Sequence, residues 1–167
     1  MRELDTERLI RTLQDHGVRF VLVGGMAAVA HGSALPTEDV DIAPARDEAN
    51  MDRLAAALRE LGARIRTGDP DGVAFPINTG FLVSQPHMLN LTTDAGDLDL
   101  TITPSGFPDG YATLIDDAVE LDLGGGTQVM VASLADVITS KEAAGRDKDH
   151  RALPYLRALQ EEIASSG

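Results

Sequence analysis

Two short segments of this chain alternate aspartate with an aliphatic residue, and they constrain the fold more than any other feature. They read Asp39-Val40-Asp41-Ile42 and Asp97-Leu98-Asp99-Leu100. Since residues i and i+2 of a β-strand share a face, each segment predicts a strand that buries its aliphatic side chains and presents two carboxylates on the other face. Aspartate is a poor strand former, and neighbouring carboxylates repel unless a cation lies between them. The segments therefore predict two strands that present their acids to a common point.

The number of Asp-x-Asp pairs decides little, because the chain has 18 aspartates among 167 residues and contains two further pairs. Asp69 and Asp71 flank a proline in a predicted turn, where aspartate is common. Asp147 and Asp149 open a predicted helix, where acids suit the helix dipole. Placement inside a strand therefore singles out the first two pairs.

The remaining periodicities predict a mixed α/β or α+β fold: a central mixed sheet flanked by helices, with further helices at the C-terminus. We expect a single domain over 1–167, with a core at about 18–132 and a C-terminal helical part at about 133–164. The expected helices cover 6–16, 26–31, 48–61, 133–144 and 147–163. The expected strands cover 19–23, 39–42, 73–75, 81–83, 89–91, 97–102, 119–123 and 127–131, with Gly124-Gly125-Gly126 as a hairpin loop.

Composition excludes several classes of protein. No apolar run approaches the ~18 residues of a membrane-spanning helix, and the first residues carry no signal-peptide pattern, so we expect a cytoplasmic protein with no membrane partner. With no cysteine, disulfide frameworks, zinc–thiolate sites and thiol nucleophiles are excluded. The formal net charge of −13 argues against duplex nucleic acid spread over the whole surface. A local basic patch remains possible, because Lys141, Arg146, Lys148 and Arg151 fall close together.

The paired glycines Gly24-Gly25 suggest a phosphate site. They end a predicted buried strand and lead directly into a helix, so backbone N–H groups at the start of that helix are open to an anion. The spacing matches neither a P-loop nor a dinucleotide-binding glycine motif. Convergent carboxylates without His or Cys favour Mg²⁺ or Mn²⁺. One element would thus hold phosphates, and the other would hold the metals that bridge them.

These motifs together resemble the nucleotidyltransferase (DNA polymerase β-like) superfamily, most closely the small bacterial proteins related to AbiEii-type toxins and minimal nucleotidyltransferases. The resemblance lies in Gly24-Gly25, His31-Gly32, the segment 37–42 and the segment Lys141 to Asp149, and it spans about 18–43 and 97–157. Two positions depart from the family pattern. Gly25 stands where many relatives carry Ser, and Leu35-Pro36 stands where an Arg is frequent.

The resemblance implies a metal-dependent transfer of NMP from an NTP to a hydroxyl. Asp39 and Asp41 would bind two divalent ions, and Asp99, or alternatively Asp97, would complete the site and orient or deprotonate the acceptor. Nucleotide and phosphate contacts are expected from Gly24, Gly25, Thr37, Lys141 and Arg146. Asp149 could instead pair with a neighbouring cation and hold the lysine-bearing helix, and His31 is expected to satisfy backbone carbonyls at a helix end.

The acceptor stays open at this stage. The likeness to toxins suggests a toxin–antitoxin system, with the 3′ end of tRNA or a protein hydroxyl as acceptor and an antitoxin as partner. An acidic surface would suit a cationic small molecule such as an aminoglycoside. An inactive module that binds nucleotide or a partner chain is the non-enzymatic alternative.

Overall fold

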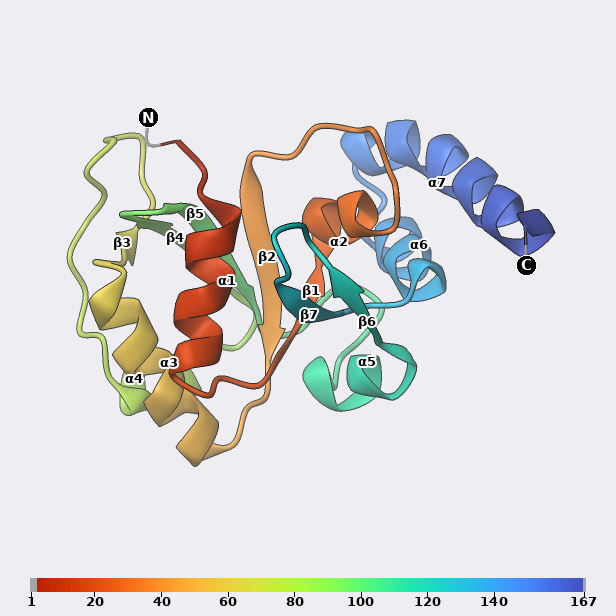
Figure 1. The fold of residues 1–167 in the computed structure, drawn as a ribbon. Coiled ribbons are helices and arrows are strands. Elements are labelled where there is room, and N and C mark those ends of the chain that lie inside the picture. The colour runs from red at the N-terminus through yellow and green to blue at the C-terminus, as the bar shows by residue number, and fades with distance from the viewer. Residues whose placement is uncertain (1–2, 167) are drawn as a thin grey trace.

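The computed structural model describes residues 3–166 and is built around one seven-stranded mixed sheet (Figure 1). The strands are β1 Phe20–Val23, β2 Asp39–Pro44, β3 Arg64–Ile65, β4 Met88–Thr93, β5 Gly96–Thr101, β6 Val119–Asp122 and β7 Gln128–Val131. Across the sheet they lie in the order β3-β4-β5-β2-β1-β7-β6. The pairs β2–β5 and β1–β7 are parallel, and the other neighbours are antiparallel. The two acidic strands β2 and β5 are therefore direct neighbours near the centre of the sheet.

Helices flank this sheet, as the sequence predicts for a mixed α/β fold. Their bounds are α1 Thr6–Asp15, α2 Gly24–Ala30, α3 Glu48–Glu60, α4 Thr79–Val83, α5 Tyr111–Asp117, α6 Leu134–Ala144 and α7 Asp147–Ser166. In Figure 1, α1, α3 and α4 lie beside the β3–β4–β5 half of the sheet, whereas α2, α6 and α7 gather beside the other half. The predicted C-terminal helices are confirmed as α6 and α7.

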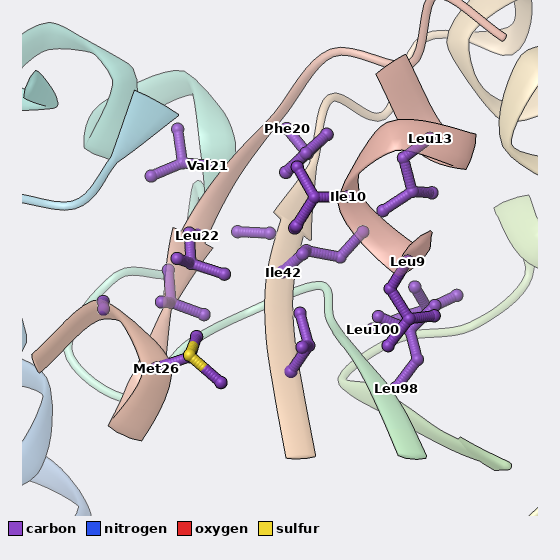
Figure 2. Packing of buried hydrophobic residues seen from close by; sticks show 14 of the residues in the cluster. Leu9, Ile10, Leu13, Phe20, Val21, Leu22, Met26, Ile42, Leu98 and Leu100 are labelled. Atoms are coloured by element: carbon purple, nitrogen blue, oxygen red, sulfur yellow. The ribbon is translucent and has the colours of Figure 1, made fainter. Parts of the chain in front are cut away.

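The hydrophobic core explains why the acids of β2 and β5 share one face. Ile42, Leu98 and Leu100 are buried and pack with the apolar stripe of α1, which Leu9, Ile10 and Leu13 form (Figure 2). Because side chains alternate along a strand, burying Val40, Ile42 and Leu98 turns Asp39, Asp41 and Asp99 to the opposite face. The core thus fixes the direction in which the carboxylates point.

Two predicted strands between the acidic strands are wrong, and one helix after those strands is not among the predicted elements. The segment Phe81–Val83 is not a strand but the end of α4, because Asn78 caps that helix by accepting a hydrogen bond from Phe81 N at 2.8 Å. The expected strand at 73–75 reduces to one isolated bridge between Val73 and Ile65. Helix α5 was not expected, and it begins after Gly110, whose φ of 55° lies in the left-handed region. Its first turn follows a conformation that glycine tolerates best.

None of the helices within residues 3–166 combines the length and the hydrophobicity that crossing a bilayer requires.

Candidate active site

The carboxylates of Asp39, Asp41 and Asp99 meet at one point, as the sequence predicts. In the parallel pairing of β2 with β5, Asp41 lies opposite Asp99 and Asp39 lies opposite Asp97. One oxygen from each of Asp39, Asp41 and Asp99 lies within 4.8 Å of the other two. Asp99 is only 6% exposed, and the other two are half-buried. Strand register therefore assembles a compact acidic triad.

Three acids this close cannot all be ionised without compensation. Burial, followed by hydrogen bonding and repulsion from Asp99, raises the pKa of Asp41 from 3.8 to about 8. Burial and then repulsion from Asp99 raise the pKa of Asp39 to about 6. Without a bound cation, the triad therefore retains protons near neutral pH. A cation bound there would favour the ionised forms that these shifts disfavour.

The triad suits a small, hard cation. Oxygen ligands of one Mg²⁺ lie about 2.0–2.1 Å from the ion, which places them roughly 3–4 Å from one another in octahedral geometry. The spacing in the triad, within 4.8 Å, needs only a small adjustment to reach that range. Carboxylate oxygens without a thiolate or imidazole are also the donor set of Mg²⁺ or Mn²⁺ rather than zinc. The residues present therefore fit the expected metal.

Gly24 lies directly against the triad. It begins α2 with a φ of 66°, and a Cβ at this position would overlap Oδ2 of Asp41. Only glycine meets both conditions at low cost. A Cβ on Gly25 would lie 3.0 Å from Thr37 Oγ1, so Thr37 borders the same turn. The predicted phosphate-binding residues Gly24, Gly25 and Thr37 are therefore brought together next to the acids.

Lys141 reaches the site from α6 and is held by Asp149. The Asp149 side chain is fully buried, lies 3.6 Å from Lys141 Nζ, and accepts hydrogen bonds from Arg146 N and Nε at 3.1 and 2.7 Å. Burial works against the ionised form, but the hydrogen bonds from Arg146 outweigh it and lower the pKa of Asp149 below its usual value. The expectation that Asp149 holds the lysine-bearing helix agrees with these contacts. Arg146 is bound to Asp149, and its side chain is exposed at the site.

Two cavities meet at the triad. The first has a volume of about 450 Å³ and extends over β4 and β5 to α5 and α6, where Asn90, Phe107, Leu114 and Asp136 line it. The second has a volume of about 930 Å³ and extends from Gly24-Gly25 along α7, where Arg151 and Tyr155 line it. Both share Gly24, Asp39, Asp41, Lys141, Arg146 and Lys148. The acids and the cations of the C-terminal segment thus stand between two open spaces.

Arg66 is a residue of the site to which no sequence motif points. Its Nη2 donates to Asp99 Oδ1 at 2.5 Å, and its Nη1 lies 3.4 Å from Asp97 Oδ2. The contact depends on the register of β3, β4 and β5, and a lone arginine before a turn gives no local signal of it. Of the two candidates for the third acid, Asp99 is the one that joins the triad, and Asp97 contacts Arg66 from outside.

His31 lies at the end of α2, away from the acids. Its Nε2 lies 2.8 Å from the carbonyl oxygen of Ala132, which follows β7. This contact is the carbonyl-satisfying role expected for a histidine at a helix end. It also ties α2 to the strand that leads into α6.

Comparison with known proteins gives one family match and two solved structures of similar fold. The model of the family described as "Nucleotidyl transferase AbiEii toxin, Type IV TA system" matches residues 8–151. The structure is similar to the lincomycin-bound lincosamide antibiotic adenylyltransferase LnuA, with a TM-score of 0.61 and 15% identity over 95% of this chain and 99% of that one. It is also similar to TM1012 from Thermotoga maritima, described as a nucleotidyltransferase, with a TM-score of 0.55 and 16% identity over 96% and 97% of the two chains. No curated protein matches the chain significantly.

Proposed function

The chain belongs to the AbiEii nucleotidyl transferase toxin family and is a nucleotidyltransferase; we propose that it moves NMP from an NTP to a hydroxyl with divalent ions held by Asp39, Asp41 and Asp99. The observation that carries this proposal is the meeting of the three carboxylates within 4.8 Å, directly against the turn at Gly24. A plain solvated strand face would not bring the acids of two strands to one point.

The metal requirement follows from the charge of the site. Two ions, Mg²⁺ or Mn²⁺, would be held by Asp39 and Asp41, with Asp99 completing the set. When bound, they would supply Lewis-acid stabilisation of the charge that develops on the transferred phosphoryl group. The raised pKa values of Asp39 and Asp41 support a site shaped for cations rather than for bare carboxylates.

The triphosphate would lie in the larger cavity, with its phosphates at Gly24 and Gly25. Lys141 is mostly buried, with 16% of its side chain exposed, and Asp149 holds its ammonium at the edge of both cavities. A lysine restrained in this way gives a fixed positive charge to the leaving pyrophosphate at little further entropic cost. Arg146 and Thr37 line the same cavity and are proposed as further phosphate contacts.

The nucleoside would lie along α7. Lys148, Arg151 and Tyr155 all line the larger cavity, and the seven residue steps of helix from Lys148 to Tyr155 cover about 10 Å. Tyr155 is 66% exposed, and stacking of a base on an aromatic ring contributes about 1–3 kcal/mol. We therefore assign Tyr155 to the base and the cations nearer the triad to the phosphates.

In the proposed reaction the acceptor oxygen forms a bond to the α-phosphorus, and the bond from that phosphorus to the oxygen of the β-phosphate breaks. Pyrophosphate leaves with the electron pair, and the acceptor proton passes to Asp99 or to water that Asp99 orients. Because Asp99 lines the smaller cavity and not the larger one, the acceptor would enter through the smaller cavity. Both the strands and the helices α6 and α7 contribute to this site, which supports one functional unit over 1–167.

The family assignment favours an acceptor found in a toxin–antitoxin context, a tRNA 3′ end or a protein hydroxyl, with an antitoxin as partner and the cytoplasm as the place of action. A small-molecule acceptor is the second candidate. It is favoured by the smaller cavity, whose volume of about 450 Å³ is in the range of small-ligand sites and whose wall includes Asp136. LnuA, whose fold this chain shares, is an adenylyltransferase of a lincosamide antibiotic.

The proposal is tested by incubating the protein with Mg²⁺ and each labelled NTP in the presence of total tRNA, the protein itself, aminoglycosides or lincosamides. We expect label on one acceptor, lost in the double variant Asp39→Asn plus Asp41→Asn. The variant Asp71→Asn, which alters an exposed Asp-x-Asp turn, is the matched control and should retain transfer. Absence of Mg²⁺-dependent transfer to every acceptor, together with absence of NTP binding, would refute the proposal.

A further inference from the structure

Arg66 is bound to the third carboxylate from outside the triad. Arg66 follows β3, and its backbone N–H donates to Asn90 O at 2.9 Å. This bond holds the backbone of Arg66 against β4. Its side chain extends over β4, the strand between β3 and β5, and meets the carboxylates that project from β5. Its Nη1 donates to Leu91 O at 3.3 Å. The guanidinium is therefore bound to a backbone carbonyl of β4 as well as to the acids of β5.

At β5 the guanidinium lies between two carboxylates with different surroundings. It donates to Asp99 Oδ1 at 2.5 Å, and it lies 3.4 Å from Asp97 Oδ2. The side chain of Asp99 is 9% exposed, whereas that of Asp97 is 35% exposed. Asp97 and the Leu91 carbonyl thus hold Arg66, and Arg66 in turn contacts the buried acid of the triad.

This contact leaves Asp99 able to serve the reaction. A carboxylate has two oxygens and about four lone-pair sites, so the single bond from Nη2 uses only part of its capacity. A charge-assisted bond from a planar, anchored guanidinium also restricts rotation of the carboxylate about its bond to Cβ. The bond therefore sets the direction of the oxygens that face Asp39 and Asp41.

We propose that Arg66 is a positioning residue of the transferase: held by Asp97, it orients Asp99, which strand register brings to the triad, toward the metal-binding position. The proposal rests on the metal-dependent function proposed above. It gives the second aspartate of β5 a separate role: Asp97 holds the arginine, and Asp99 faces the ions and the acceptor.

The opposing effect is charge. A guanidinium near the triad also repels a divalent cation, so removal of Arg66 would tighten metal binding if repulsion outweighed orientation. The guanidinium is already paired with two carboxylates, Asp97 and Asp99, which offset its charge. Outer-shell partners of metal ligands usually contribute about 10–100-fold to metal affinity or activity. We therefore expect the loss of orientation to dominate.

The test measures binding of Mn²⁺ alone to the full chain by electron paramagnetic resonance, with thermal melting in EDTA as the measure of folding. In Arg66→Met we expect the dissociation constant for Mn²⁺ to rise by about 10–100-fold. Arg66→Lys keeps the positive charge but loses the planar fork that uses both Nη1 and Nη2, so it should recover only part of the affinity. Asp97→Asn should weaken binding less than Arg66→Met does. The matched control is Arg64→Met, because Arg64 donates to the Asp71 carbonyl at 2.6 Å and should leave Mn²⁺ affinity unchanged.

Unchanged or tighter Mn²⁺ binding in a folded Arg66→Met protein would overturn the proposal. If Arg66→Met unfolds at a lower temperature than the natural chain, Arg66→Lys is compared with the natural chain instead. Equal Mn²⁺ affinity in these two proteins, changed equally by Asp97→Asn, would contradict an orienting contact. Failure of the wider function has a different signature. In that case the natural chain would bind Mn²⁺ no better than Asp41→Asn does, whatever stands at position 66.

Discussion

Replacing Asp41 with Asn should stabilise the metal-free protein while it abolishes transfer. The folded chain raises the pKa of Asp41 from 3.8 to about 8, so between these values the folded state binds more protons than the unfolded state. Stability therefore decreases as the pH rises through this range, and it levels off above the folded value. Asparagine is neutral at every pH, and its amide can still donate to Asp99.

The size of the effect follows from the shift. One pKa unit corresponds to about 1.4 kcal/mol, so the unfavourable contribution of Asp41 is about 2 kcal/mol at pH 5 and at most about 5 kcal/mol at pH 8. The free energy of unfolding of Asp41→Asn should thus exceed that of the natural chain by roughly 3 kcal/mol more at pH 8 than at pH 5. In a chain of this size 1 kcal/mol shifts the Tm by about 2–4 °C, so Asp41→Asn should raise the Tm by roughly 6–12 °C more at pH 8 than at pH 5.

The assay is thermal or urea unfolding in EDTA at pH 5 and pH 8, followed at pH 8 by addition of Mg²⁺. Mg²⁺ should raise the Tm of the natural chain and not that of Asp41→Asn, because only a site that binds the ion gains stability from it. Asp71→Asn is the control for removal of an exposed acid and should show no dependence of this kind. An Asp41→Asn protein that is equally stable or less stable at pH 8 would refute the reasoning on burial and repulsion.

Three further substitutions test the rest of the site. Gly24→Ala should cost about 1–3 kcal/mol of stability and abolish NTP binding, because the left-handed backbone and the Asp41 carboxylate both exclude a Cβ; a folded variant with normal NTP affinity in calorimetry would contradict this. Lys141→Met should raise the KM for NTP about tenfold or more, as expected for loss of one charge-assisted phosphate contact, and an unchanged KM in a transfer assay would remove Lys141 from the site. Tyr155→Trp introduces the only tryptophan, and its fluorescence should change on addition of NTP with Mg²⁺ but not with inorganic triphosphate; the same response from Tyr111→Trp, on α5, would show that the change is not local to α7.

The parts of the fold that could be predicted from sequence are those with local periodicity. Asp39-Val40-Asp41-Ile42 alternates strictly, so both the strand and the face of its acids follow from the period of two. The helix over Glu48–Glu60 follows in the same way from its apolar stripe. Helix α4 was wrongly expected as a strand, because three apolar residues in a row carry no period, and the side-chain cap from Asn78 decides the outcome.

The parts of the site that could not be predicted depend on register between distant strands. The choice of Asp99 over Asp97 requires knowing that Asp41 lies opposite Asp99, because both acids share a face in isolation. Predicting the contact of Arg66 with Asp99 also requires the strand order β3-β4-β5. The sequence around a single arginine gives no sign that its side chain extends over a neighbouring strand. Asp149 was predictable as an ionic partner because Arg146 lies three residues before it on the chain.

The central claim is that Asp39, Asp41 and Asp99 together hold divalent ions beside the turn at Gly24. The most direct test is a crystal structure with Mn²⁺ and a nonhydrolysable NTP, in which anomalous scattering locates the ions. The account predicts manganese bound to oxygens of all three carboxylates, with the triphosphate at Gly24-Gly25. Manganese peaks elsewhere, or a nucleotide bound away from the three aspartates at saturating ligand, would contradict it.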